Sequence, residues 1–175
     1  MLFAAAASVV LGAVMTAGDW AWAALSIRHR VVYGLIHGAV MCLCLGIAVG
    51  VRAGRPGPAA AAGPAIGIVA AAAFYALAPV LRWNAMFPAW MLLWILFALL
   101  QRRLRMQESM GTAVLRGVVA ALASGAVFYA ISGIWVDESH ADTDLIRHFG
   151  AWTFAFLPGF LALFVGLPTR AAPRQ

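Results

Sequence analysis

Long apolar stretches, separated by short polar ones, fill almost the whole of this 175-residue chain. Each is close in length to the roughly 20 helical residues that cross a hydrocarbon core of ~30 Å. They lack the alternation of apolar and polar residues that is typical of membrane β-barrel strands. We therefore predict six transmembrane helices, over residues 2–25, 31–51, 64–81, 86–101, 112–135 and 149–168.

This pattern predicts an all-α, polytopic integral membrane protein whose helices form one bundle, because backbone groups inside a bilayer must be paired within the segment. A single transmembrane domain covers residues 1–175. Its predicted parts are a first hairpin over 1–51, a cytoplasmic link over 52–63, a second hairpin over 64–101, and a third hairpin over 112–168 with an acidic outer loop at 136–144.

The last two hairpins carry similar residues at corresponding positions. Phe-Tyr-Ala at 74–76 is followed by Phe-Pro-Ala-Trp at 87–90, and Phe-Tyr-Ala at 128–130 is followed by Phe-Gly-Ala-Trp at 149–152. Two-helix units repeated in this way predict a parallel internal repeat. The second unit has about eight extra residues in its connection. They fall in the acidic loop, so we expect any site to lie near it.

The chain has a formal net charge of +6 and is 65% hydrophobic. In a soluble protein this charge would favour nucleic-acid binding, but here the arginines flank membrane helices, so we expect no nucleic-acid partner. Eight of the twelve arginines share a side with the N-terminus, and the other four are Arg28, Arg30, Arg82 and Arg147. The positive-inside rule then predicts a bacterial-type inner (plasma) membrane protein with both termini in the cytoplasm.

Several chemistries are excluded by composition. The chain contains no lysine, which removes a retinal or pyridoxal Schiff base and a P-loop nucleotide site. Cys42 and Cys44 lie two residues apart on a predicted helix and point to nearly opposite faces, so they cannot pair with each other. Glycines four residues apart, such as Gly63 and Gly67, favour close helix packing. Whether the protein is an enzyme stays open.

Ionisable residues gather on the predicted outer side. His37 lies about 9 Å below the outer end of its helix, and Asp19 lies at a similar depth on the preceding one. Such groups need a partner or a water-filled cavity. One hypothesis is an Asp19–His37 hydrogen bond that locks the first hairpin. A second is a site for zinc or another divalent metal at Asp19, His37, His148 and Asp144, and a third is a haem with His37 and His148 as axial ligands.

Aromatic and polar residues near the outer helix ends predict either an interfacial belt or the mouth of a ligand pocket. In the pocket hypothesis, arginine and asparagine side chains bind the anionic head group of a lipid or another amphipathic molecule. Pro158 interrupts the last helix, which makes this helix the expected ligand-lining element. The predicted pocket residues are Tyr33, Arg82, Trp83, Asn84, Arg147 and Trp152.

Three classes of function follow. Short loops and the lack of a catalytic motif favour a non-catalytic membrane component or accessory subunit, which contacts lipids, a membrane protein partner or copies of itself. The second class is a small-solute or ion transporter with Asp19 and His37 as a protonatable gate. The third is a metal-dependent membrane hydrolase or a haem-binding protein with an outer His/Asp site. We expect the first class.

Overall fold

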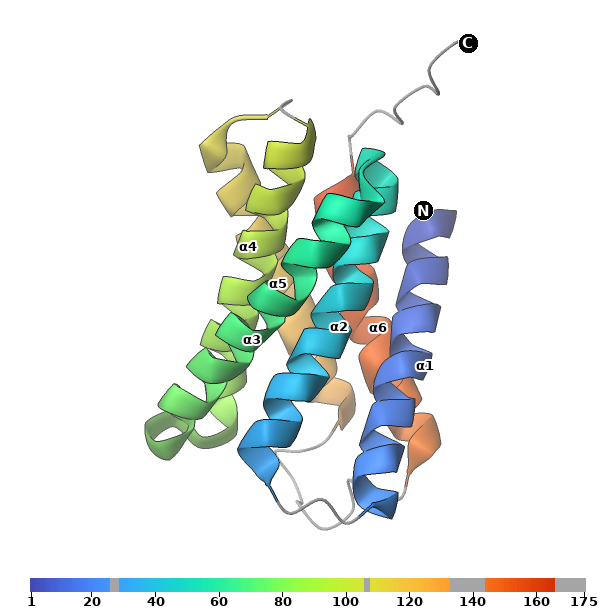
Figure 1. The fold of residues 1–175 in the computed structure, drawn as a ribbon, viewed down its shortest axis with the longest axis vertical. Coiled ribbons are helices and arrows are strands. Elements are labelled where there is room, and N and C mark those ends of the chain that lie inside the picture. Colours follow the sequence, from blue (N-terminus) through green and yellow to red (C-terminus); the bar gives the residue numbers. More distant parts are fainter. Residues whose placement is uncertain (26–28, 106–107, 133–143, 166–175) are drawn as a thin grey trace.

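The computed structural model describes residues 1–25, 29–105, 108–132 and 144–165. These residues form five continuous helical stretches, and no strand occurs among them. The helices and the 3-10 turn η1 are shown in Figure 1: α1 (Leu2–Ala24), α2 (Arg30–Ala53), α3 (Pro56–Leu81), η1 (Arg82–Ala85), α4 (Met86–Arg105), α5 (Met110–Ser132) and α6 (Leu145–Phe164). At η1 the chain reverses direction between α3 and α4, and Arg82 there has a φ of 50° and a ψ of −134°, outside the helical region.

Four helical segments are long and apolar enough to cross a membrane. They are α1, α2, the continuous stretch Pro56–Arg105 and α5. The predicted all-α fold with membrane-spanning helices is confirmed at this level. The helix α6 is not among the four, and its first turn carries the polar residues Arg147 and His148. The count of six spans therefore stays a prediction.

The helices form a closed ring in chain order. Each helix packs against the next one, and α6 returns to pack against α1. At one end of the bundle, the rings of Phe3 in α1 and Phe164 in α6 have centroids 5.8 Å apart. The centre of the ring is filled largely by buried side chains of α4 and α6, among them Trp94, Phe97, Phe156 and Phe160.

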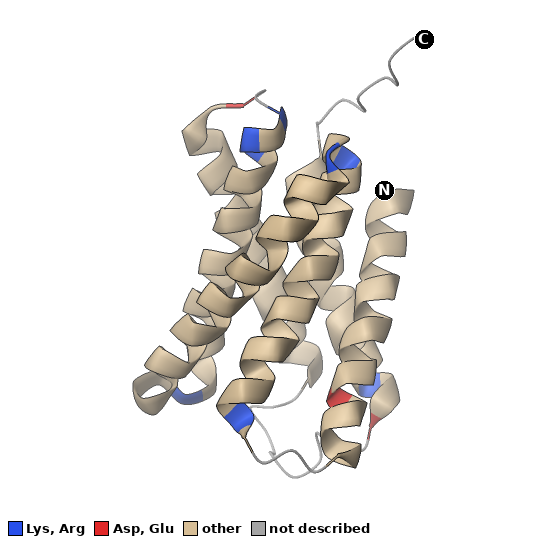
Figure 2. Cartoon of the chain, viewed as in Figure 1, with Lys and Arg blue, Asp and Glu red and all other residues tan. Residues whose placement is uncertain are grey.

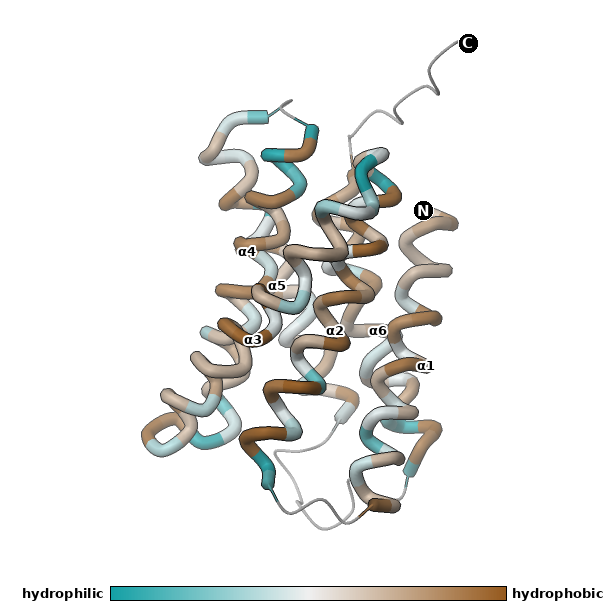
Figure 3. The backbone as a smooth tube through the Cα atoms, in the orientation of Figure 1, coloured by the Kyte–Doolittle hydropathy of each residue, from teal (hydrophilic) through white to brown (hydrophobic). Residues whose placement is uncertain are grey.

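Charged residues lie at the two ends of the bundle, with apolar residues between them (Figures 2 and 3). We name the ends after one residue each. The Arg52 end holds Arg52, Arg105, Glu108 and Arg116. The Asp19 end holds Asp19, Arg30, Arg82 and Arg147. The described arginines thus divide between two ends of the bundle, as the predicted topology requires.

The link predicted over 52–63 is much shorter in the structure. Gly54 closes α2 in the left-handed conformation, with a φ of 71°, which glycine adopts without steric cost. The Arg55 N–H donates back into the last turn of α2 at 2.8 Å, as in a Schellman motif. Pro56 begins α3, because a proline in the first turn needs no N–H partner. The alanines at 59–62 therefore belong to a helix, which their high helix propensity favours.

The helices α2 and α3 approach each other through small residues. A Cβ added to Gly63 would collide with the backbone of Cys42, and one added to Gly67 would collide with the backbone of Gly38. Close packing at these glycines, predicted from their spacing, is confirmed. Because the backbones touch directly in the middle of the bundle, the two helices form one rigid wall.

Candidate functional site

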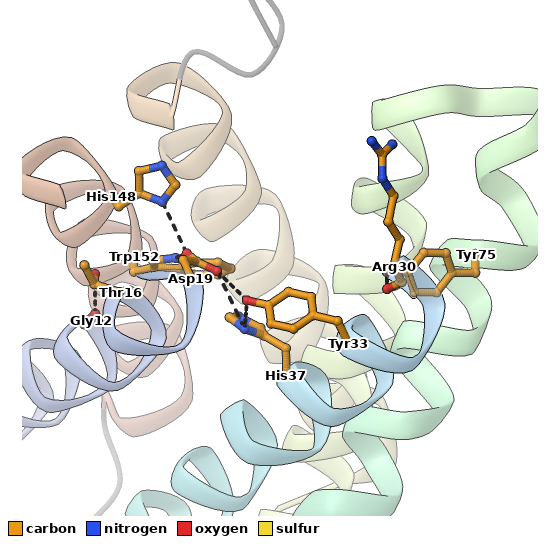
Figure 4. A network of polar contacts seen from close by, with 9 residues as sticks. All are labelled: Gly12, Thr16, Asp19, Arg30, Tyr33, His37, Tyr75, His148 and Trp152. Atoms are coloured by element: carbon orange, nitrogen blue, oxygen red, sulfur yellow. Dashed lines mark hydrogen bonds and ion pairs between the residues drawn. The ribbon is translucent and has the colours of Figure 1, made fainter. Parts of the chain in front are cut away.

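The carboxylate of Asp19 is the centre of a polar network that joins α1, α2 and α6 (Figure 4). From α2, the Tyr33 hydroxyl donates to Oδ1 at 2.8 Å. From α6, the Trp152 indole N–H donates to Oδ2 at 2.7 Å, and His148 Nδ1 donates to the same oxygen at 3.2 Å. Three donors from two other helices therefore hold one carboxylate.

His37 joins this network through Tyr33. Its Nδ1 lies 2.8 Å from the Tyr33 hydroxyl oxygen and 3.7 Å from Asp19 Oδ1. Because the hydroxyl donates its own proton to Asp19, it accepts one from His37, and the His37 proton must then be on Nδ1. The predicted direct Asp19–His37 hydrogen bond is wrong in this detail, since Tyr33 bridges the two residues.

Helical spacing explains why these side chains meet. Tyr33 and His37 are four residues apart on α2, and His148 and Trp152 are four apart on α6, so each pair lies on one helix face. The side chains of Asp19 and His37 are 22% and 12% exposed. A carboxylate this far from water is stable only if hydrogen-bonded, which the converging donors achieve.

Two adjoining cavities lie beside the network. The outer cavity, at the Asp19 end, has a volume of about 400 Å³, and the inner cavity, which extends between α2, α3 and α4, has about 290 Å³. Both fall near the range of about 300–1,000 Å³ that is typical of sites for one small molecule. The walls they share are formed by Asp19, Tyr33, Tyr75, Trp83, Phe128 and Trp152.

Most charged residues of this cavity pair line its outer part, among aromatic and apolar side chains. Arg30, Arg147 and His148 line the outer cavity in addition to Asp19. Apart from the residues of the network, the deeper part of the inner cavity is apolar, with walls that include Met41, Phe74, Met86, Trp90 and Leu93. The site therefore has a charged mouth and an apolar interior.

Trp152 connects the polar network to an aromatic wall. Its indole N–H is bonded to Asp19, while its ring lies nearly parallel to Trp90, at a centroid distance of 6.4 Å and an angle of 20°. On other sides the ring contacts Phe128 at 4.5 Å and Phe156 at 5.8 Å. Aromatic contacts at these distances stabilise each other, so the wall is rigid.

Tyr75 forms the side wall between α2 and α3. Its hydroxyl donates to the Arg30 carbonyl oxygen at 2.6 Å, which ties α3 to the first turn of α2. Its ring lies over Gly34, where an added Cβ would collide with the phenol group. The glycine thus provides the space that this wall residue occupies.

The predicted pocket residues do not all lie at the cavities. Tyr33 and Trp152 lie on the shared wall, as does Trp83, and Arg147 lines the outer cavity. Arg82 and Asn84 are exposed in η1 and line neither of the two cavities. Sequence reasoning missed the lining role of Arg30, Tyr75, Trp90 and Phe128, although all but Arg30 lie in the predicted repeat.

The proposed metal ligands are brought together only in part. Asp19, His37 and His148 meet, but the carboxylate of Asp144 accepts from the Arg147 N–H at 2.9 Å and caps α6. Among the described residues, no three His, Cys, Asp or Glu side chains are arranged to hold one ion. The loop residues 136–143 lie outside the described residues.

The two histidines of the haem hypothesis also meet at Asp19. The Nδ1 atoms of His37 and His148 lie 3.7 Å and 3.2 Å from the two oxygens of the same carboxylate. These contacts involve only one nitrogen of each imidazole, so the hypothesis that His37 and His148 bind a haem stays a prediction.

Comparisons of the chain with protein-family models, with curated proteins and with solved structures find no match. The function must therefore follow from the chemistry of the site, since a helical bundle alone is compatible with many functions.

Proposed function

We propose that the protein is a non-catalytic component of the membrane that binds one small amphipathic molecule in the cavity pair. The observation that carries this proposal is the change from the charged lining of the outer cavity to the apolar lining of the inner one. A molecule with a polar head and an apolar body matches both environments at once.

The polar network supports binding by fixing the walls of the site. Asp19 is held by donors from α2 and α6, and two of these donors, Tyr33 and Trp152, are themselves wall residues. A wall that is ordered before the ligand arrives loses little conformational entropy on binding. In this proposal, the role of the network is to position Trp152 and Tyr33 beside the ligand.

We further propose six membrane spans, with both termini in the cytoplasm of a bacterial-type cell. The closed ring supports this, because α6 lies between α5 and α1 and is as long as α4. The division of the described arginines between the two ends supports the orientation.

A fluorescent-protein fusion after Gln175 is expected to be bright in the cytoplasm. A cysteine at Asn84, in a background without the native cysteines, is expected to react only with reagent added outside.

The parallel repeat is part of the same proposal. Trp90 and Trp152 occupy matching positions in the two hairpins, and their rings face each other at 6.4 Å. Phe74 and Phe128, also at matching positions, both line the inner cavity. Matched residues that meet around one cavity are what two copies of a hairpin, related by an axis along the bundle, would produce.

The binding proposal is tested by extracting the protein in lipid nanodiscs and identifying bound small molecules by mass spectrometry. Two variants fill the inner cavity from different helices: Ala70→Leu in α3 and Ala89→Leu in α4. The matched control is Ala13→Leu, at an exposed position of α1. We expect a compound that remains bound to the wild type and the control and is depleted in both cavity variants. If all four proteins, each folded, retain the same compounds in the same amounts, the proposal is wrong.

A further inference from the structure

We infer that the bound molecule carries an anionic head group, a carboxylate or phosphate, on a single apolar tail, with the head between Arg30 and Arg147. This inference rests on the proposed binding function and adds the chemical class of the ligand. It follows from the charges at the mouth, from the state of the one carboxylate there and from the volume of the site.

The mouth has an excess of positive charge among its described lining residues. Arg30 and Arg147 contribute two guanidinium groups, and Asp19 contributes the one carboxylate. Arg30 lies in the first turn of α2 and Arg147 in the first turn of α6, so the two guanidinium groups come from different helices.

A cationic head group does not match this site. The aromatic walls alone would suit a cation, but the guanidinium groups of Arg30 and Arg147 would repel it. Asp19 Oδ1 accepts from Tyr33, and Oδ2 accepts from both Trp152 and His148. Three of the about four acceptor positions of this carboxylate are therefore used within the protein, which weakens its attraction for a bound cation.

Arg147 is held in place for anion binding. Its Nε donates to the Ile131 carbonyl oxygen at 2.9 Å, which fixes the side chain of α6 against the end of α5. The bond uses only one of the five guanidinium N–H donors. Parallel hydrogen bonds from a guanidinium to carboxylate or phosphate oxygens are among the strongest in proteins, so a fixed arginine favours this head group.

The volume of the inner cavity limits the size of the apolar part of the ligand. Its value of about 290 Å³ is at the lower end of single-ligand sites. The cavity runs from the shared wall at Trp83 toward Met41 and Leu93, in the direction of the bundle centre. One acyl chain matches an apolar cavity of this volume.

The test uses hexadecanoic acid with a mid-chain diazirine, and the methyl ester of the same compound. Wild-type protein in nanodiscs of zwitterionic lipid is photolysed with each probe, and the labelled residues are mapped by mass spectrometry. We expect the acid to label inner-cavity residues such as Met41 and Met86 about tenfold more than the ester, because only the acid can form a charge-assisted hydrogen bond with a guanidinium group. Excess unlabelled hexadecanoic acid or hexadecyl phosphate should remove this labelling, and the stronger competitor identifies the head group.

Two arginine variants test the location of the head. Arg30→Gln and Arg147→Gln should each reduce cavity labelling by the acid toward the level of the ester, without changing labelling by the ester. The matched control is Arg82→Gln, because Arg82 is exposed at the same end of the bundle and lines neither cavity. It should label as the wild type does. Thermal unfolding of each variant verifies that it is folded.

The outcomes separate this inference from the proposed function. If acid and ester label the cavity equally, or if hexadecyltrimethylammonium competes more strongly than the anionic compounds, the inference of an anionic head group is wrong. The proposed binding function is not affected by either result. Labelling confined to lipid-facing positions, with no effect of competitors, overturns the anionic single-tail ligand; the nanodisc extraction then decides whether the cavity binds anything else. Unchanged labelling in both arginine variants would show that the head lies elsewhere.

Discussion

Trp152 donates its indole N–H to Asp19 Oδ2 over 2.7 Å while its ring forms part of the cavity wall. One side chain thus joins the last helix of the ring to the first and shapes the ligand site. The stability of the closed ring and the shape of the site are therefore coupled through this tryptophan.

Replacing Trp152 with phenylalanine removes the N–H and keeps an aromatic ring. We expect the free energy of unfolding to fall by about 1–3 kcal/mol, because a buried carboxylate oxygen loses a donor. Thermal unfolding in detergent measures the change. The control is Trp20→Phe, since Trp20 is 58% exposed and the same atoms are removed there. Equal melting temperatures for the two variants would show that the bond to Asp19 does not stabilise the fold.

Gly34→Ala is expected to displace Tyr75, because the new Cβ would overlap the phenol ring. The cost should be about 1–3 kcal/mol, as for other overpacked sites. In a Tyr75→Ala background the same change should be neutral or stabilising, since alanine favours a helix over glycine by about 0.5–1 kcal/mol. A double-mutant cycle by thermal unfolding measures the coupling. Additive effects would mean that the two residues do not share this space.

Gly63→Ala should separate α2 from α3. The added Cβ would meet the Cys42 backbone, which cannot rotate away as a side chain can, so we expect a loss of about 1–3 kcal/mol. Gly57 lies in the same helix with open space around it, and Gly57→Ala should cost nothing. Chemical unfolding of both variants in detergent compares them directly. Similar losses in both would point to a general effect of alanine in α3.

Arg116→Ala should destabilise the Arg52 end of the bundle. Its Nη1 donates to the carbonyl oxygens of Ala162 and Val165 at 3.1 Å and 2.7 Å, and its Nε lies 3.0 Å from the Glu108 carboxylate. Removing it leaves the end of α6 and a largely buried carboxylate without this partner, at a cost of about 1–3 kcal/mol. Arg103→Ala, at an exposed position of α4, removes the same charge and should have little effect on thermal unfolding. A comparable loss in both variants would assign the effect to net charge.

The sequence was sufficient to predict an all-helical chain with long apolar helices and the nearness of Asp19 and His37. The length of the apolar stretches indicates the helices. An ionisable residue within such a stretch stands out because it costs free energy in a membrane unless it has a partner. The role of Tyr33 as a bridge was not predictable in the same way. It depends on how α2 is rotated relative to α1, and a helix pattern specifies which residues share a face but not which neighbour that face meets.

The start of α3 shows a different kind of error. Residues 52–63 are rich in alanine, glycine and proline, a composition that is typical of a flexible link. In the structure only Gly54 and Arg55 of this segment lie outside a helix, because the prolines at 56 and 58 lie in the first turn of α3 and the alanines favour a helix. The cavities were likewise predicted only in outline. Trp90 and Phe128 line the inner cavity because residues of all six helices converge there, and this convergence can be seen only in the three-dimensional structure.

The closure of the ring between α1 and α6 has a consequence for biosynthesis. Asp19 is separated from His148 and Trp152 by 129 and 133 residues in the chain. When α1 first enters the membrane, its carboxylate has only Tyr33 and His37, from the next helix, within reach. Its remaining partners arrive only when α6 has been synthesised. Until then the carboxylate of the first hairpin is incompletely bonded, so the ring between α1 and α6 can close only after more than a hundred further residues have been added to the chain.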